Sequence, residues 1–310
     1  MNRLLRKIAK NVQGLLTFSA IAVNTIVCFI PIFVLALVKL VIPVKVIRTT
    51  ITGWLMSIGD VWVAANARIL ALGNDTTWDV RGLDELSVDH WYLIIANHQT
   101  WVDIVAVQTV FNRRIPFLKF FIKQELVWFP LLGIAWWAMD MPFMKRYSKS
   151  YLAKHPEKKG KDLDATRNAC AKFRDNPTSV INFVEGTRFT EEKRVKRRSP
   201  FTHLLPPRAG GVALALTSMS DIFDSILDVT IAYPDGPVTF WEMVCGQFPH
   251  VVIDVRRREP ESWLFDGDYE NDREFRKRFH KWLTGIWEQK DDRIRELVAE
   301  TAGDTGRMKL

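Results

Sequence analysis

Two long apolar stretches dominate the hydrophobic pattern near the start of the chain. The first, residues 15–38, contains no charged side chain. As a helix rising about 1.5 Å per residue it would be about 36 Å long, sufficient to cross a hydrocarbon core of about 30 Å. The second, residues 49–72, is interrupted by Asp60 and Arg68, which is typical of an interfacial helix. We therefore expect an N-terminal membrane anchor over residues 1–75.

The orientation of this anchor is left open by the charges around it. Basic residues precede the first stretch and also follow it, at positions 3, 6, 7 and 10 and then 39, 45 and 48. The apolar run is too long for a signal peptide, and no small-residue cleavage site follows it, so an uncleaved anchor is favoured. A single span and a hairpin that dips into one leaflet both remain open.

Short apolar runs alternate with helical patterns from residue 76 onward. The runs at 91–96, 179–184, 228–233 and 251–255 are typical of strands, and those at 102–111, 163–173, 211–219 and 240–244 of helices. A final amphipathic helix carries Phe275, Phe279, Trp282, Leu283, Ile286 and Trp287. This alternation predicts an α/β fold with a mixed sheet covered by helices over residues 76–302, followed by a flexible tail at 303–310.

The net charge of the chain indicates which class of partner it binds. Its 310 residues carry a formal net charge of +8, which favours an anionic partner such as a nucleic acid, an acidic membrane or a phosphorylated small molecule. Basic runs at 145–161 and 193–198 suit a solvated or membrane-facing surface. Neither run interleaves the aromatic residues that a nucleic-acid stacking platform needs, so we regard nucleic acid as an unlikely partner.

Several common site types are absent from the sequence. It contains no G-x-S-x-G, G-x-G-x-x-G, P-loop or H-E-x-x-H pattern, which excludes the commonest hydrolase, dinucleotide, NTPase and zinc-protease motifs. The three scattered cysteines form neither a disulfide framework nor a metal-binding spacing. We expect no metal.

His98 and Asp103 stand five positions apart, directly after the predicted strand at 91–96. On one continuous helix this spacing turns two side chains about 140° apart, so they can meet only if His98 lies on the turn before the helix. A histidine there can act as a general base whose tautomer the aspartate fixes. Thr100 and Asp103 also match a capping box. Spacing alone favours the capping interpretation, although the two roles are compatible.

A second polar cluster follows the predicted strand at 179–184. It consists of Glu185, Gly186, Thr187 and Arg188. A glycine turn exposes backbone N–H groups suited to an anion, and an arginine fork matches a phosphate. A plain surface turn is the structural alternative. Two further features are an apolar stretch that becomes basic at Arg146, and a proline turn at 206–208 that enters a helix.

Taken together, these blocks resemble the glycerolipid acyltransferases, the lysophosphatidate acyltransferase superfamily. The motif N-H-x-x-x-x-D is met by Asn97, His98 and Asp103, and E-G-T-R by residues 185–188. The runs FVEGTRFTEEK, LLPPRAGG and PLLGIAWWAMDMPFMKR are most similar to the branch of the lysocardiolipin acyltransferases and their bacterial inner-membrane relatives. The chain departs from the family pattern at its doubled proline, 206–207, and at Val184, where many members have proline.

The resemblance implies transfer of a fatty acyl group from a thioester to the free hydroxyl of a lysophospholipid, with 1-acylglycerol-3-phosphate as the expected acceptor. The donor would be acyl-CoA or acyl carrier protein, and no further cofactor is expected. His98 would be the general base and Asp103 its orienting carboxylate. The substrate-binding residues would be Arg146, Glu185, Gly186, Thr187, Arg188, Pro207 and Arg208.

The same resemblance implies a bacterial inner membrane location, with membrane lipids as partners and the site facing the cytoplasm. The competing hypothesis is an acyltransferase-like membrane protein that binds anionic lipid or RNA without catalysis. The intact motif residues favour the enzyme, because a binding protein has no need of a buried base. The sequence leaves open the acceptor, the acyl-chain length and the choice between the two donors.

Overall fold

The central feature of the computed structural model is a mixed sheet. The structure describes residues 3–144, 172–219, 222–269 and 271–303. Within these ranges six strands pair in the order β1-β8-β7-β2-β6-β3. They are β1 (Thr77–Arg81), β2 (Tyr92–Ala96), β3 (Leu118–Phe120), β6 (Ser179–Phe183), β7 (Ser225–Ala232) and β8 (His250–Arg258). Only β7 and β8 pair antiparallel, so the predicted mixed sheet is confirmed.

The strands that the sequence predicts are the buried ones. Every residue of β2 and of β7 is buried, as expected of central strands covered on both faces. The edge strands β1 and β3 are not anticipated by the sequence, since β1 is only half-buried and β3 has three residues. A second, two-stranded sheet pairs β4 (Ile122–Lys123) with β5 (Phe143–Met144).

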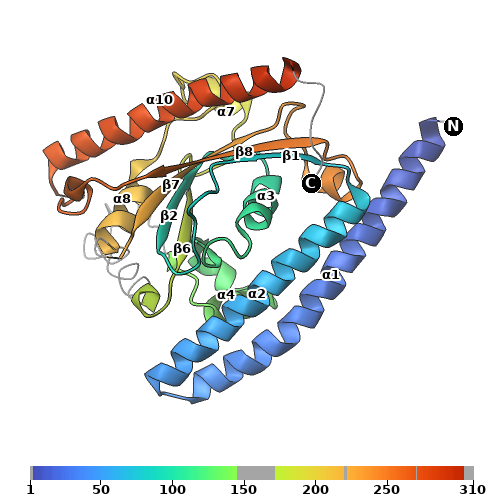
Figure 1. Cartoon of the computed structure of the whole chain (residues 1–310), viewed down its shortest axis with the longest axis horizontal. Coiled ribbons are helices and arrows are strands. Elements are labelled where there is room, and N and C mark those ends of the chain that lie inside the picture. Colours follow the sequence, from blue (N-terminus) through green and yellow to red (C-terminus); the bar gives the residue numbers. More distant parts are fainter. Residues whose placement is uncertain (1–2, 145–171, 220–221, 270, 304–310) are drawn as a thin grey trace.

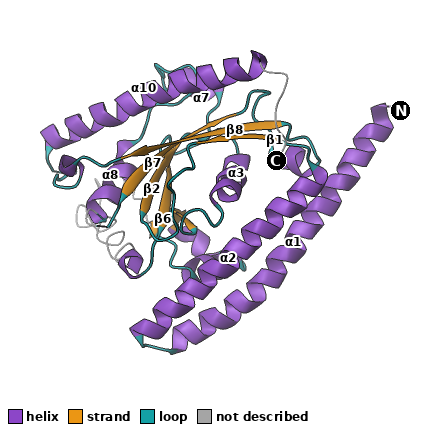
Figure 2. Ribbon diagram, in the orientation of Figure 1, coloured by secondary structure: helices purple, strands orange, loops and turns teal. Residues whose placement is uncertain are grey.

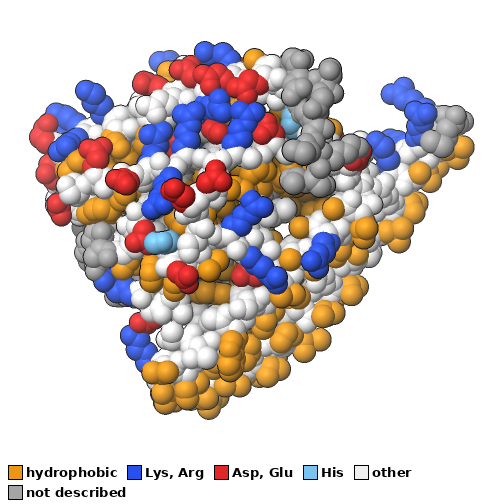
Figure 3. All heavy atoms as spheres, in the orientation of Figure 1, with side chains coloured by type: hydrophobic (Ala, Val, Ile, Leu, Met, Phe, Trp, Pro, Cys, Tyr) orange, Lys and Arg blue, Asp and Glu red, His pale blue; other side chains and the backbone are white. Residues whose placement is uncertain are grey.

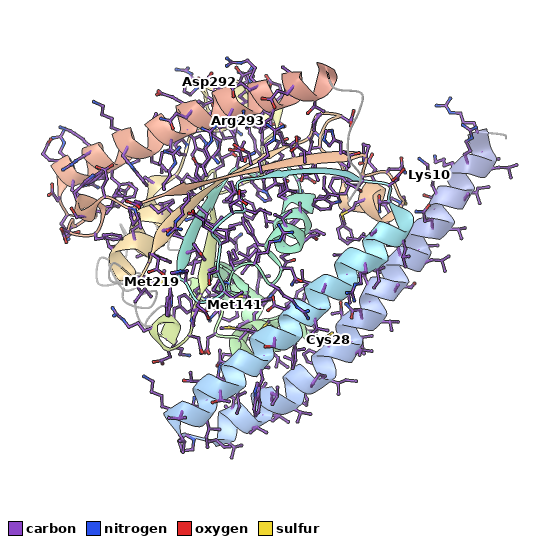
Figure 4. The ribbon with its side chains drawn as sticks, viewed as in Figure 1. Lys10, Cys28, Met141, Met219, Asp292 and Arg293 are labelled. Atoms are coloured by element: carbon purple, nitrogen blue, oxygen red, sulfur yellow. The ribbon has the colours of Figure 1, made fainter. Side chains whose placement is uncertain are left out.

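Helices cover both faces of the main sheet (Figure 2). One face packs against α3 (Val102–Phe111) and α9 (Phe240–Val244), and the other against α8 (Ala209–Ser218) and α10 (Arg273–Gly303). The amphipathic pattern of α10 is confirmed, because Phe279, Leu283, Ile286 and Trp287 are all buried on the sheet side. Figure 4 labels Arg293, which also reaches the sheet and lies 3.1 Å from Asp254 on β8.

The short helices of the described residues are α4 (Leu132–Ala138), α7 (Glu191–Lys196) and the 3-10 turns η1 (Gln124–Trp128), η3 (Lys172–Asp175) and η4 (Ser262–Leu264). The predicted helix at 163–173 lies outside the described residues except for its last two positions, which belong to η3. The predicted tail at 303–310 lies outside them as well, apart from its first residue.

The two apolar stretches form a helical hairpin of α1 (Arg3–Val41) and α2 (Lys45–Gly73), which runs along one side of the sheet domain (Figure 1). Both helices are long and apolar enough to cross a membrane. The outer face of α1 presents hydrophobic side chains, whereas charged side chains gather over α10 (Figure 3). The backbone carbonyl of Asp60 accepts a hydrogen bond from Asn112, so this charged position of α2 faces the sheet domain. The structure thus supports membrane association.

Candidate active site

The motif residues lie where the parallel strands β2 and β6 end. Ala96 and Phe183 are register partners, so the turns that follow them start side by side. Ligands of open α/β sheets bind at this edge. Asn97 is fully buried and ties the first turn to β7, because its side chain donates to the carbonyl of Ile231 and accepts from the N–H of the same residue, each at 2.8 Å. Asn97 therefore fixes the backbone that carries His98.

His98 lies on this turn, and Asp103 lies in the first turn of α3. Nδ1 of His98 is 2.7 Å from Oδ2 of Asp103. An ionised Asp103 holds the ring proton on Nδ1, which leaves Nε2 as an acceptor. The ring stacks on Phe183 with centroids 4.2 Å apart, and its side chain is 12 % exposed. Among the described residues Nε2 has no hydrogen-bond partner, so a basic nitrogen is available at the surface of the turn.

Asp103 is fully buried and also organises the turn itself. Its Oδ2 accepts the backbone N–H groups of Gln99 and Thr100. This is one half of the predicted capping box. The other half differs from the prediction. The hydroxyl of Thr100 accepts the N–H of Val102 at 3.4 Å and not that of Asp103. It also donates to the carbonyl of Val238 at 2.6 Å, and Trp101 occupies the N-cap position. Asp103 thus serves both the turn and the histidine.

The second oxygen of Asp103 accepts a hydrogen bond from a residue that was not predicted from the sequence. The hydroxyl of Tyr233 donates to Oδ1 at 2.6 Å. Burial, together with the charge of Asp103, raises the pKa of Tyr233 well above its ordinary value, so the phenol stays a donor. The position of Tyr233 in the sequence could have indicated that it lies in the site, because it directly follows β7. This strand is parallel to β2 and ends at the same edge of the sheet.

Glu185 connects two loops by hydrogen bonds to their backbone. It is fully buried, and its two oxygens accept the N–H of His98 at 3.0 Å and the N–H of Leu205 at 2.9 Å. Burial raises the pKa of its carboxyl to about 7, although the two backbone donors act in the opposite direction. We therefore revise the expectation that Glu185 contacts substrate. Its side chain instead joins the histidine turn to the proline turn.

Gly186 and Arg208 are brought into contact. Gly186 has a φ of +65°, a left-handed conformation that favours glycine. A side chain at this position would meet Cδ of Arg208 at 3.0 Å. Arg208 follows Pro207 and is the N-cap residue of α8, and its N–H donates to the carbonyl of Val184. The proline turn and the E-G-T-R turn therefore form one surface.

Thr187 and Arg188 complete that surface. The guanidinium of Arg188 lies over the ring of Trp101, 4.9 Å from its centroid, and so beside the histidine turn. Lys193 donates to the hydroxyl of Thr187 at 3.1 Å and to the carbonyl of Arg188 at 2.8 Å. From its sequence Lys193 belongs to a basic run that suits a solvated or membrane-facing surface, and this contact was not predicted. Arg146, the remaining predicted residue, lies outside the described part of the chain.

The family model and the proteins to which this chain is similar are described as acyltransferases. The family model described as acyltransferase matches residues 77–239. Among curated relatives, the 1-acyl-sn-glycerol-3-phosphate acyltransferase delta of Homo sapiens is 24% identical over 213 residues, covering 64% of this chain and 51% of that protein. The gamma protein of Mus musculus is 27% identical over 166 residues, covering 48% and 41%. The chain therefore spans about half the length of the curated relatives it matches.

Solved structures similar to this chain include that of the 1-acyl-sn-glycerophosphate (LPA) acyltransferase PlsC from Thermotoga maritima, with a TM-score of 0.49 and 15% sequence identity. The similarity covers 92% of this chain and 98% of that one.

Proposed function

Since this chain belongs to the acyltransferase family, we propose that it is a membrane-bound enzyme that transfers a fatty acyl group from a thioester to the free hydroxyl of a lysophospholipid. The proposed acceptor is 1-acylglycerol-3-phosphate, which would give phosphatidic acid. The observation that carries the proposal is the pair of His98 and Asp103, 2.7 Å apart, with Nε2 of the histidine unpartnered among the described residues. A pure binding module would not need this arrangement.

In the proposed reaction, Nε2 of His98 accepts the proton of the acceptor hydroxyl as its oxygen attacks the thioester carbonyl carbon. A new C–O bond forms, and the C–S bond breaks when the tetrahedral intermediate collapses. The departing thiolate takes the proton from the imidazolium and leaves as a thiol. A positioned general base of this kind typically contributes about 10²–10⁴ in rate. Asp103 keeps Nε2 unprotonated before attack and stabilises the imidazolium afterwards.

The phosphate of the acceptor is proposed to bind the E-G-T-R turn. Arg188 supplies a planar fork, and the Gly186–Thr187 backbone supplies N–H donors. Its position over Trp101 sets Arg188 beside the histidine turn, so that one acceptor molecule can reach both. Arg146 remains a predicted phosphate ligand, and Arg208, held against Gly186, is proposed to meet the phosphates of the donor.

The hairpin explains how the two substrates would meet. The acceptor is bilayer-bound and the donor is soluble, so the catalytic edge must stay at a membrane surface. The apolar outer face of α1 suits attachment to lipid (Figure 3). We propose the cytoplasmic side of a bacterial inner membrane as the location, since acyl-CoA and acyl carrier protein are cytoplasmic.

The decisive experiment compares His98→Ala with a matched variant. Purified full-length protein would be assayed with a labelled acyl-CoA and a panel of lysophospholipids, and with acyl carrier protein as an alternative donor. His98→Ala should lose at least about 10²-fold in turnover. His90→Ala is the control, because His90 also pairs with an aspartate, Asp224, but lies before β2 at the other edge of the sheet.

Two results would contradict the proposal. Turnover of His98→Ala equal to that of His90→Ala would remove the histidine from the mechanism. No acyl transfer by the unaltered protein to any acceptor on the panel, combined with tight binding to anionic vesicles or RNA, would favour the competing hypothesis of a binding module.

A further inference from the structure

A pocket of about 280 Å³ lies where the α1–α2 hairpin turns. Its lining includes Asp175 and Asn176, which precede β6, whereas Glu185 and His98 follow the opposite ends of β6 and β2. The pocket is therefore on the other edge of the sheet from the catalytic residues. Nothing in the proposed acyl transfer uses it.

The pocket carries an excess of positive charge. Its ionisable lining residues are Lys39, Lys45, Arg48, Lys172, Asp140 and Asp175. Four cations thus face two carboxylates. A concave site with unbalanced positive charge attracts anions.

The ion pairs within the pocket do not neutralise all four cations. Lys39 and Lys172 share one carboxylate, that of Asp140. Lys45 pairs with Asp175 at 2.7 Å, yet its side chain is 77 % exposed and therefore accessible to a ligand.

Arg48 is the cation without a carboxylate among the described residues. Its Nη1 donates to the carbonyls of Lys39 and Ile42, which positions the guanidinium at the helix turn. Within the described ranges its other N–H groups have no hydrogen-bond partner. A guanidinium held in this way is suited to the two oxygens of a phosphate group.

Apolar side chains surround the turn. Leu40, Val41, Val44 and Val46 are 63 %, 79 %, 51 % and 74 % exposed. Apolar side chains beside lysines and arginines are the arrangement that lets a segment enter the acyl region while its cations stay level with the headgroups. This combination distinguishes the pocket from a site for a soluble anion, which would not need exposed apolar residues on the adjoining helix turn.

We propose that this pocket binds the phosphodiester headgroup of an anionic phospholipid of the bilayer and so fixes the hairpin turn on anionic membrane. The acyl chains of that lipid would lie along the exposed apolar residues of the turn, and Arg48, Lys45 and Lys172 would contact the phosphate. This lipid is a bound structural partner and not the acyl acceptor.

The test measures lipid retention by the full chain in detergent micelles, with phosphatidylglycerol and phosphatidylcholine titrated separately and bound lipid counted by native mass spectrometry. The pocket variant is Lys45→Gln/Lys172→Gln, which leaves the buried pair of Lys39 and Asp140 intact. The control is Arg6→Gln/Lys7→Gln, which removes the same charge from exposed positions at the far end of α1. All proteins would be measured without an acyl donor and again in a His98→Ala background.

Unaltered protein should prefer phosphatidylglycerol, and the pocket variant should bind it about tenfold more weakly, while the control stays within about twofold. Equal losses in both variants would show general electrostatic attraction and overturn the proposal. A pocket-dependent rise in Tm with inorganic phosphate alone, without a preference for phosphatidylglycerol, would make it a soluble-anion site and overturn the lipid assignment. His98→Ala should leave retention unchanged, so the result stands apart from the acyltransferase proposal.

Discussion

The hydrogen bond from Tyr233 to Asp103 offers a sharp test of how the site is organised. Tyr233→Phe removes one hydroxyl and leaves the ring in the core, where it packs beside Phe248 with centroids 6.2 Å apart. The buried Oδ1 of Asp103 then loses its donor at 2.6 Å. The contacts of Oδ2 with His98 and the turn N–H groups stay in place.

The magnitude of the effect follows from this geometry. A hydrogen bond to a charged group contributes about 1.5–3 kcal/mol, and we expect the lower part of that range as the loss in the free energy of unfolding because Oδ2 keeps its own donors. Tyr233 stabilises the carboxylate most when the imidazole is neutral, since no positive charge then compensates Asp103. Its removal therefore disfavours the base-competent form of His98. We expect the acid limb of the kcat/KM profile to move upward by about 0.5–1 pH unit.

The assay is a pH profile of acyl transfer by purified Tyr233→Phe, measured beside thermal unfolding. Tyr92→Phe is the matched control, because Tyr92 is also fully buried and its hydroxyl accepts the N–H of Ser87 at the amino end of β2, away from the site. Tyr92→Phe should lose stability without any change in the pH profile. If Tyr233→Phe behaved in the same way, Tyr233 would be only a packing residue and the positioning role would be refuted.

Three further predictions follow from neighbouring contacts. Arg188→Ala should raise KM for a phosphate-bearing acceptor at least tenfold while changing KM little for a monoacylglycerol; equal effects on both acceptors would exclude a phosphate contact. The carboxyl of Glu185 has a pKa of about 7 in the folded protein against 4.5 in the unfolded chain, so the folded protein binds this proton more tightly. The free energy of unfolding should therefore fall as pH rises from 4.5 to 7, by up to about 1.4 kcal/mol per pH unit. Chemical denaturation of Glu185→Gln at a series of pH values should lack this slope. Gly186→Ala should reduce activity, because a Cβ would both strain the φ of +65° and displace Arg208; unchanged kinetics with either substrate would show that the two turns are independent.

The elements that were predicted from the sequence share a physical property. The strands β2, β6, β7 and β8 are largely buried, so each contains a mainly apolar run in the sequence. The edge strand β1 has charged residues at its third and last positions, Asp79 and Arg81, and is only half-buried, so no apolar run marks it in the sequence. The hairpin helices extend beyond their apolar cores because helix continues through flanking charged residues such as Arg6 and Arg48, which remain solvent-accessible or bonded to backbone.

In the candidate site, only the contacts between residues that directly follow predicted strands could be predicted from the sequence. His98 and Glu185 directly follow apolar strands, and parallel strands end at a common edge, so their proximity follows from the predicted sheet. That Glu185 is buried against the N–H of Leu205 was not predictable. Nor was the contact of Lys193 with the E-G-T-R turn, because a basic run in the sequence looks the same whether it is solvated or bonded.

By itself the sequence determined the α/β class, the two apolar N-terminal stretches and the placement of His98 and Asp103 on a strand–turn–helix junction, because strand, turn and helix signals are local and these residues are close together in the chain. Only the tertiary structure decided which residues far apart in the chain pair with one another, both in the candidate site and in the pocket at the hairpin turn. Tyr233 lies 130 positions from Asp103, and Lys39 lies 101 positions from Asp140. No periodicity spans such intervals. Such residues become neighbours because burial of the apolar faces brings particular surfaces of the sheet and the hairpin together.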